Sequence, residues 1–416
     1  MTSLLAGKKI VLGVTGSIAA YKAAMLASAL TQAGAQVDVI MTDAATRLVA
    51  PLTFQSLTKR PVHTDMFRLL DQAEITHVSL GMSADLLVIA PATANTISKL
   101  AVGLADDLLS TTVLAATCPI LLAPAMDADM YENRVIQENV AKLRERGVVV
   151  VEPELGRLAS GLVGRGRLAD VDEILGRIRW ILGRNGDLAG VSVLVTAGGT
   201  QEPVDPVRII TNRSSGKMGY AIAEAAMERG ARVTLISGPT ALKAPRAVEF
   251  VPAVTATDML EAVLAKIRHT DVLIMAAAVA DWRVDQAASQ KMKRSDKAIQ
   301  LNLVPNPDIL AETAKATEGA KRPLRVGFAA ESEDLAARAR DKLVRKKLDL
   351  IVANDVAAGG GVFGSDLNEV LLLDGAGREV QVPLSPKTEV AQRILDEVVR
   401  LLGGRSGSSH STTRGL

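Results

Sequence analysis

The order of apolar segments and glycine turns constrains the fold of this chain more than any other feature. Residues 9–14 form a short apolar run rich in β-branched side chains, and a glycine turn separates it from residues 19–34, where apolar side chains recur at helical spacing. A second apolar run follows at residues 36–41. A strand–turn–helix–strand unit of this kind is typical of a parallel sheet.

The same plan occurs twice along the chain. In the first half, the remaining buried strands are predicted at residues 85–90, 119–123 and 148–151. In the second half, a helix is predicted at residues 217–229. One strand is predicted before it, at 191–196, and one after it, at 232–237. Later strands are predicted at residues 272–275, 325–328, 350–352 and 369–373. A chain of 416 residues is also too long for one ordinary core. We therefore predict an α/β protein with two Rossmann-like three-layer domains, each with a mostly parallel sheet.

Glycine-rich and polar segments mark the limits of these domains. The segment 183–190 reads GRNGDLAG, which favours a linker. The predicted domains are residues 1–188 and 189–402. The low-complexity segment 403–416 is predicted to be a disordered tail.

Composition excludes several classes of function. The net charge is only +2 and aromatic residues make up 2% of the chain, so neither an extended basic surface nor aromatic stacking platforms for nucleic acid are expected. A single cysteine, Cys118, excludes an intrachain disulfide. The first residues lack the pattern of a secretory signal, and no apolar run reaches the roughly 18 residues of a membrane span. We expect a cytoplasmic protein without nucleic-acid or membrane partners.

Two segments in the first half indicate a ligand site at the carboxyl ends of the strands. Gly16, Ser17 and Ile18 follow a strand and open a helix, where backbone N–H groups suit a phosphate. Thr93 lies just past a second buried strand, and His77 precedes that strand. An ordinary turn without a ligand, and a structural histidine, remain alternatives.

Two glycine-containing loops in the second half indicate another anion site. They span residues 196–208 and 212–219, and the second carries Ser214, Ser215 and Lys217. Lys342 and Lys346 share one face of a predicted helix, and a triphosphate needs such partners. Asp281 ends a buried strand, where a carboxylate can bind ribose hydroxyls.

The first half resembles the flavin-dependent phosphopantothenoylcysteine decarboxylases. The resemblance rests on VTGSIAAYK, HVSL, APATANTISKLAVGLADDLL and APAM. It implies an FMN whose phosphate lies at Gly16, Ser17 and Ile18, with flavin contacts near Thr42 and Thr93. It also implies His77 as the catalytic base.

The chain departs from this family at two positions. Asp127 stands where the family has an asparagine that is thought to hold the substrate carboxylate, and Ser160 stands where the family has a cysteine proton donor. An ionised aspartate would repel the substrate carboxylate, and a serine hydroxyl is a weaker acid than a thiol, whose pKa is about 8.5. We therefore hypothesise that the FMN fold is kept while the decarboxylase step is slowed, altered or lost.

The second half resembles the phosphopantothenate–cysteine ligases over nearly all of residues 190–400. The resemblance rests on TAGGTQEPVDPVRIITNRSSGKMGYAIAEA and on MAAAVADW, NPDIL, GFAAES, LDLIVANDV and FGSDLNEV in the family's order. It implies CTP and Mg²⁺, with the metal held through the triphosphate; no metal-ligating residue is identified. It implies that Asn212 stabilises an acyl-cytidylate and that Lys291, or its neighbour Lys293, serves the active-site loop. The implied CTP contacts are Ala277, Asp281, Lys291, Asn306, Pro307, Asp308, Ile309, Phe328, Lys342 and Lys346.

Together the two resemblances imply a bifunctional enzyme of coenzyme A biosynthesis. It would join 4′-phosphopantothenate to cysteine and then decarboxylate the product to 4′-phosphopantetheine. They also imply a homo-oligomer, in which trimeric flavin domains linked by dimeric ligase domains would give a dodecamer. Two alternatives remain: a ligase carrying an inactive FMN-binding scaffold, and a nicotinamide-dependent oxidoreductase, although neither glycine turn is a complete GxGxxG.

Overall fold

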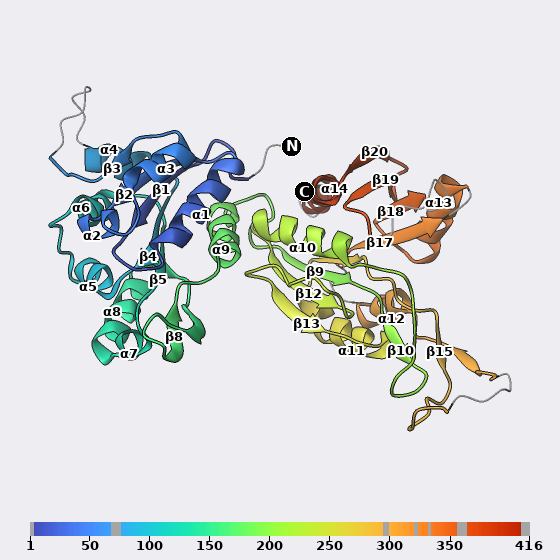
Figure 1. Ribbon diagram of the computed structural model, residues 1–416. Coiled ribbons are helices and arrows are strands. Elements are labelled where there is room, and N and C mark those ends of the chain that lie inside the picture. The colour runs from blue at the N-terminus through green and yellow to red at the C-terminus, as the bar shows by residue number, and fades with distance from the viewer. Residues whose placement is uncertain are drawn as a thin grey trace. The chain divides into compact units, whose positions relative to one another are not determined.

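The protein is described by a computed structural model over residues 4–67, 76–293, 299–319, 323–331, 334–355 and 364–408. The chain divides into two compact units, Met1–Leu182 and Gly183–Leu416 (Figure 1). Each unit is a sheet covered by helices, and each is described here by itself.

The first unit is built on a six-stranded parallel sheet with the order β3-β2-β1-β4-β5-β6. Its strands are β1 (Lys9–Val14), β2 (Gln36–Met41), β3 (Val62–His63), β4 (Leu86–Ala92), β5 (Ile120–Pro124) and β6 (Val149–Val150). Its helices are α1 (Ala20–Gln32), α2 (Asp43–Thr46), α3 (Pro51–Thr58), α4 (Thr76–Ser83), α5 (Ala94–Val102), α6 (Leu108–Ala115), α7 (Ala128–Glu132), α8 (Arg134–Glu145) and α9 (Val171–Gly183).

Alternate side chains of the strands face two separate cores. In β1, Ile10 and Leu12 pack with α1, α3 and α9, whereas Val11 packs with α4, α5, α6 and α8. Because both faces of the sheet are covered, its strands are apolar throughout, which is the pattern the sequence displays. The predicted three-layer arrangement is therefore confirmed for this unit.

The second unit has an eight-stranded sheet with the order β13-β12-β9-β14-β17-β18-β19-β20. The first six strands are parallel, and β19 and β20 run antiparallel to their neighbours. They are β9 (Ser192–Ala197), β12 (Arg232–Ser237), β13 (Glu249–Pro252), β14 (Val272–Met275), β17 (Leu324–Glu331), β18 (Leu350–Asp355), β19 (Leu367–Asp374) and β20 (Glu379–Pro386). The helices are α10 (Lys217–Glu228), α11 (Ala256–Lys266), the 3₁₀ turn η1 (Ile267–His269), α12 (Ile309–Ala316), α13 (Leu335–Arg345) and α14 (Lys387–Ser408). The predicted mostly parallel sheet is confirmed here too.

Three short antiparallel pairs lie outside the main sheets. They are β7 (Glu154–Arg157) with β8 (Val163–Arg167), β10 (Gln201–Pro203) with β11 (Ile209–Thr211), and β15 (Trp282–Val284) with β16 (Leu303–Pro305). The sequence did not predict them, because segments such as ELGR and VGRGR have no apolar run to bury.

The end of the chain differs from the prediction of disorder from Gly403 onward. Helix α14 continues to Ser408, so residues 403–408 are helical, and residues 409–416 lie outside the described part. Two glycines cost only about 1 kcal/mol each inside a helix, which a long helix with a buried face tolerates.

Close packing of α10 on β9 gives a stability prediction. A Cβ on Gly219 would lie 2.6 Å from the Ala197 Cβ and 3.0 Å from the Thr196 carbonyl oxygen. The variant Gly219→Ala should therefore lose about 1–3 kcal/mol through overpacking and melt several degrees lower. Gly403→Ala is the matched control, since nothing lies within 4 Å of its added Cβ. It should leave the melting temperature unchanged or raise it slightly, and equal losses in the two variants in a calorimetric scan would contradict the packing argument.

Candidate functional site

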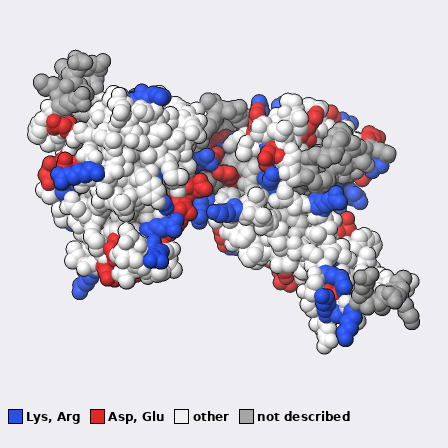
Figure 2. All heavy atoms as spheres, viewed as in Figure 1, with Lys and Arg blue, Asp and Glu red and all other residues white. Residues whose placement is uncertain are grey.

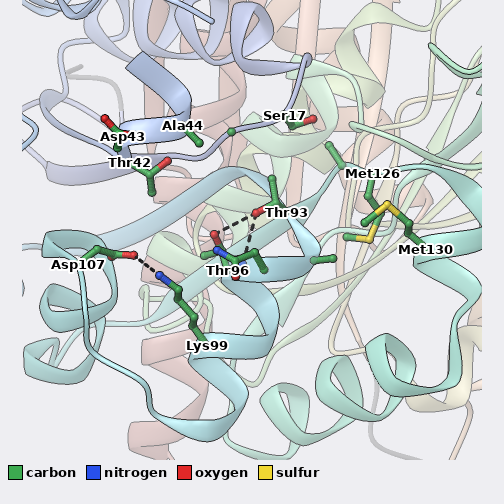
Figure 3. Close-up of a pocket in the computed structure, with 14 residues that line it drawn as sticks. Ser17, Thr42, Asp43, Ala44, Thr93, Thr96, Lys99, Asp107, Met126 and Met130 are labelled. Carbon is green, nitrogen blue, oxygen red and sulfur yellow. Dashed lines mark hydrogen bonds and ion pairs between the residues drawn. The ribbon is translucent and has the colours of Figure 1, made fainter. Parts of the chain in front are cut away.

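The first unit holds a cavity of about 580 Å³ at the carboxyl edge of its sheet. The strand order reverses between β1 and β4, and at such a reversal two neighbouring loops leave in opposite directions and open a crevice. Figure 3 shows the residues that line the cavity: Gly16, Ser17, Thr42, Asp43, Ala44, Thr93, Ala94, Asn95, Thr96, Lys99, Asp107, Ala125, Met126 and Met130. The predicted residues Gly16, Ser17, Thr42 and Thr93 thus come together, whereas Ile18 is a mostly exposed neighbour outside the lining.

A buried threonine joins the two strands that flank this cavity. The Thr15 hydroxyl donates to the Pro91 carbonyl oxygen at 2.7 Å and accepts from the Thr93 N–H at 3.1 Å. This bridge fixes the loop after β1 against the loop after β4. Thr93 then caps α5, since its hydroxyl accepts from the Thr96 N–H, and Thr42 caps α2 in the same way through Ala45.

The start of α1 is suited to an anion. No side chain caps this helix, whose N-cap residue is Ala19, so its first N–H groups gain no partner from a capping side chain. Gly16 lies against Ala44, and a Cβ at position 16 would come within 2.5 Å of the Ala44 Cβ. Only glycine therefore leaves the space between these two loops open.

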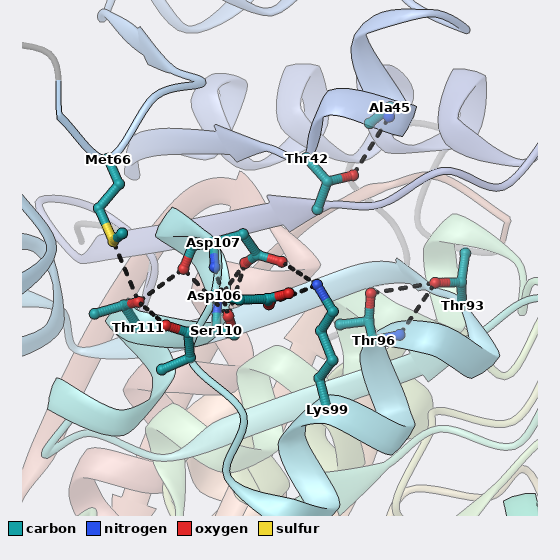
Figure 4. Close-up of polar contacts among 11 residues, drawn as sticks. Thr42, Ala45, Met66, Thr93, Thr96, Lys99, Asp106, Asp107, Ser110 and Thr111 are labelled. Atoms are coloured by element: carbon teal, nitrogen blue, oxygen red, sulfur yellow. Dashed lines mark hydrogen bonds and ion pairs between the residues drawn. The ribbon is translucent and has the colours of Figure 1, made fainter.

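One lysine projects into the cavity within a fixed ionic network (Figure 4). The Lys99 ammonium lies 2.7 Å from Asp106 and 2.9 Å from Asp107. The hydrogen bond to Asp106 is the largest cause that raises the pKa of Lys99, so this residue stays positively charged. Burial disfavours the charged form of Asp107, but the Ser110 N–H and Lys99 outweigh this and lower the pKa of that carboxyl.

A hairpin covers the segment after β5 at another side of the cavity. Gly166 of β8 accepts from the Met126 N–H at 2.9 Å, and a Cβ at position 166 would lie 2.2 Å from the Met126 carbonyl oxygen. The turn of this β7–β8 hairpin carries Ser160, whose hydroxyl donates to Asp127 Oδ2 at 2.5 Å. The two positions where the sequence departs from the decarboxylase pattern are therefore direct partners.

His77 lies apart from these lining residues. It is in the first turn of α4, half-buried, and its Nδ1 is buried without a hydrogen-bond partner within the described ranges. The prediction that His77 acts as the catalytic base is not tested by this placement.

The second unit holds a cavity, again of about 580 Å³, at the reversal between β9 and β14. Its lining includes five predicted residues: Asn212, Ala277, Asp281, Phe328 and Lys342. It also includes residues 213–219, where Gly216 is the N-cap of α10 and Gly219 lies in the first turn of that helix. Residues from loops far apart in sequence thus meet at one sheet edge.

Cationic side chains gather around this second cavity. Arg213, Lys217, Lys342 and Lys387 all line it. Burial lowers the pKa of Lys387, and the nearby charge of Lys217 lowers it further. Lys217 forms an ion pair with Asp366 at 2.7 Å. A ligand with several negative charges would offset the repulsion between these lysines.

Two asparagines, half-buried Asn354 and buried Asn368, complete the lining. The Asn354 amide donates to Asn368 Oδ1 at 3.3 Å, while Asn354 Oδ1 is buried and has no hydrogen-bond partner in the part of the chain described. A buried oxygen of this kind is costly unless a ligand or water donates to it.

The predicted residues 306–309 and Lys346 lie beside the cavity lining. The Asn306 amide donates to the Ala280 carbonyl oxygen at 2.8 Å, and the Asn306 N–H donates to that of Asp281, so Asn306 holds the Asp281 loop. Asp308 caps α12 and pairs with Lys346. Pro307 precedes this cap and Ile309 is buried in the core below it.

Lys291 and Lys293 lie outside the lining, on the loop that follows β15. Figure 2, viewed as Figure 1, shows basic side chains gathered in the region of the second unit around β15. The loop is anchored at Met292, whose N–H donates to buried Asp205 at 3.1 Å and whose carbonyl oxygen accepts from Arg208. Burial opposes ionisation of Asp205, but the N–H groups of Val207, Met292 and Arg208 lower its pKa to about 2.

Sequence reasoning missed several residues of both sites. In the first unit it missed Lys99 and Asp107, and in the second it missed Lys387, Asn354 and Asn368. Asn354 follows the apolar run of β18 directly, which is a detectable signal of a ligand-edge position. Lys387 gives no such signal, because only the tertiary fold brings the start of α14 to this edge.

Two negative findings apply to the described residues. No helix among them is long and apolar enough to cross a membrane. Within the same ranges, no three His, Cys, Asp or Glu side chains are arranged to hold a metal ion.

The chain matches two protein families along its length. Residues 2–182 match the family described as Flavoprotein, and residues 188–402 match the DNA/pantothenate metabolism flavoprotein C-terminal domain. Among solved structures, the C-terminal domain of a coenzyme A biosynthesis bifunctional protein CoaBC is 40% identical, with a TM-score of 0.45, and the match covers 53% of this chain and 99% of that one. The FMN binding protein AtHal3 is 30% identical, with a TM-score of 0.37, over 41% of this chain and 95% of that one.

A curated relative extends the match over both units. The coenzyme A biosynthesis bifunctional protein CoaBC of Bacillus subtilis (strain 168) is 46% identical over 401 residues, which make up 96% of this chain and 98% of the relative. An identity of this size over nearly the whole chain shows a shared family, and the matched region includes both units. The chain therefore belongs to the family of coenzyme A biosynthesis bifunctional proteins.

Proposed function

We propose that this chain catalyses two reactions of coenzyme A biosynthesis, one in each unit. The second unit is a phosphopantothenate–cysteine ligase that uses CTP and Mg²⁺, and the first is an FMN-dependent phosphopantothenoylcysteine decarboxylase. The observation that carries the proposal is the pair of cavities at the two strand-order reversals. One is lined by Gly16 and Ser17, which shortly precede the uncapped start of α1, and the other is lined by four cations.

The ligase step needs an activated carboxylate, because a free carboxylate does not react with an amine. Lys217, Lys342 and Lys387 would bind the triphosphate of CTP, with Mg²⁺ held through the phosphates rather than by protein ligands. Asp281 would accept from ribose hydroxyls, and Asn212 would stabilise the acyl-cytidylate. The substrate carboxylate would displace pyrophosphate from the α-phosphate of CTP to form this acyl-cytidylate, and attack by the cysteine amine on its carbonyl carbon would then release CMP. Lys291 would enter from the β15 loop, whose anchor at Asp205 is described above.

The residues of the first cavity fit an FMN. The N–H groups at the start of α1, with Gly16 and Ser17, would hold the phosphate, and Thr42 and Thr93 lie where the flavin ring would extend. Bound FMN supplies a two-electron acceptor that oxidises the substrate thiol and later returns the hydride. His77 is proposed to take the thiol proton.

A mass-resolved endpoint assay tests both activities. Purified protein is supplied with 4′-phosphopantothenate, cysteine, Mg²⁺ and either CTP or ATP. We expect 4′-phosphopantetheine and CO₂ with CTP. Phosphopantothenoylcysteine as the final product would reduce the function to a ligase with an inactive flavin scaffold, and no product with either nucleotide would refute the ligase.

A homo-oligomer and a cytoplasmic location are part of the same proposal. Large apolar side chains are exposed on the first unit, among them Ile18, Tyr21, Met25 and Leu52. Exposed apolar surface of this kind supports self-association. The trimer-and-dimer arrangement expected from the resemblance stays a prediction.

Filling the space at Gly16 should weaken flavin binding. The added methyl group of Gly16→Ala would meet Ala44 at 2.5 Å and push apart the loops that form the phosphate site. We expect at least a tenfold weaker FMN affinity, which is about 1.4 kcal/mol, measured by flavin fluorescence titration. Ligase activity should stay at the wild-type level in the same preparation; wild-type FMN affinity in the variant would place the phosphate elsewhere.

Removing a cavity lysine should weaken nucleotide binding. Lys342→Met keeps most of the side-chain volume but removes a charge-assisted bond to phosphate, which is worth about 1.5–3 kcal/mol. We therefore expect the KM for CTP to rise roughly ten- to hundredfold. Lys315→Met is the matched control, because Lys315 is on α12, exposed and paired with Glu312 outside the lining. Equal KM values for the two variants would exclude Lys342 from the nucleotide site.

A further inference from the structure

The decarboxylase reaction needs a proton donor beside the first cavity. Loss of CO₂ from a carboxylate leaves an electron pair on carbon, so each turnover consumes one proton. The chain has a single thiol, Cys118, and this residue precedes β5. It therefore lies at the amino end of that strand, whereas the cavity is at the carboxyl edge. The thiol cannot be the donor.

Three other aspartates near the cavity form ion pairs with basic side chains. Asp106 and Asp107 both pair with Lys99. Asp43 pairs with Arg47 at 2.8 Å. A carboxylate bonded to a cation favours its ionised state and is a poor source of protons. These three aspartates are therefore unsuited to the task.

Asp127 differs from these carboxyl groups in its partner. It is the N-cap of α7, shortly after β5, and in sequence it lies between Met126 and Met130, which both line the cavity on the side away from Asp107 (Figure 3). Within the described residues no lysine or arginine forms an ion pair with it. Its carboxyl oxygen instead accepts the Ser160 hydroxyl at 2.5 Å.

The hairpin geometry keeps this contact in place. Besides Gly166, Gly164 lies so close to α7 that a Cβ there would be 2.4 Å from the Ala128 Cβ. The strands that carry the Ser160 turn are thus clamped onto the residues next to Asp127. The contact joins two segments 33 residues apart in the chain, and its position is set by backbone packing rather than by the two side chains alone.

We propose that Asp127 and Ser160 form a proton-donating pair that completes the decarboxylase reaction. The inference rests on the proposed function of the first unit. A bound substrate brings its own carboxylate to Asp127, and two such groups in contact share one proton taken from solvent, because their like charges repel. When CO₂ leaves, that proton remains on Asp127 beside the new carbon–carbon double bond.

The proton then moves through the serine hydroxyl. The Ser160 O–H gives its proton to the carbon that lost CO₂, while the Asp127 O–H bond breaks and its proton goes to Ser160 Oγ. The enethiolate N–CH=CH–S⁻ becomes the thioaldehyde N–CH₂–CH=S. The hydride removed earlier from the thiol-bearing carbon returns to that carbon and gives the thiolate product. Asp127 ends as a carboxylate that accepts from Ser160, which is the bond seen in the structure.

Anaerobic stopped-flow absorbance of the full-length, FMN-loaded protein tests the pair. With phosphopantothenoylcysteine, the wild-type flavin should bleach and then recover within a turnover. Ser160→Ala and Asp127→Asn should both bleach normally but recover about 100-fold more slowly or less completely. Mass spectrometry should then show the enethiol instead of phosphopantetheine. Asp129→Asn, an exposed neighbour on α7, is the matched control and should recover like the wild type.

The double variant distinguishes a relay from two separate effects. A relay predicts that Ser160→Ala with Asp127→Asn recovers as slowly as either single variant, because each single change already breaks the same path. Multiplied effects, or normal recovery in Ser160→Ala through solvent water, would overturn the pair. Wild-type protein that releases CO₂ but yields only enethiol would also overturn it while leaving decarboxylation intact. A wild-type flavin that never bleaches would instead refute the proposed decarboxylase.

Discussion

Parallel strands that are buried on both faces leave only one place for chemistry, which is the edge where they end. In each unit the central strands are apolar over nearly their whole length, so polar side chains first occur in the loops beyond them. The Thr15 bridge shows how such an edge is made rigid, since one buried hydroxyl holds the loops after β1 and β4 together. Both cavities lie at the edge where the parallel strands end, and both occur where the strand order reverses.

The sequence predicts the sheets well because strands that are buried on both faces are rich in apolar residues. The strands at 9–14, 36–41, 232–237 and 272–275 have the predicted limits, since each is rich in buried apolar side chains. The β7–β8 hairpin and β20 lack such a run and depend on contacts made later in folding. Helix α14 continued past Gly403 for a related reason: weak helix formers at its end do not outweigh the packing of its earlier turns.

Many of the predicted residues on the cavity linings lie just beyond the end of a strand, whereas Phe328 lies within β17 and Lys342 on α13. Gly16, Thr93, Asn212 and Asp281 follow strands or open helices, and the structure places all four on cavity linings. The sequence indicates the other site residues less clearly. Lys99 lies on a face of α5, and Lys387 is the first residue of α14. The contact between Asp127 and Ser160 depends on the turn of the β7–β8 hairpin. Sequence comparison treated the last two residues as two separate losses. The structure shows that the two side chains contact each other. A carboxyl group and a hydroxyl in contact can pass a proton from one to the other, which neither residue can do alone.

The position of Lys387 connects the second cavity to the last helix of the fold. This buried lysine is the first residue of the 22-residue helix α14, which packs beside α10 on one face of the second sheet. An anion in the cavity therefore meets both the lysine charge and the positive end of the helix dipole. An anion bound in the cavity would thus also stabilise the first turn of this helix. Without an anion, the repulsion between Lys387 and Lys217 opposes the charged form of Lys387.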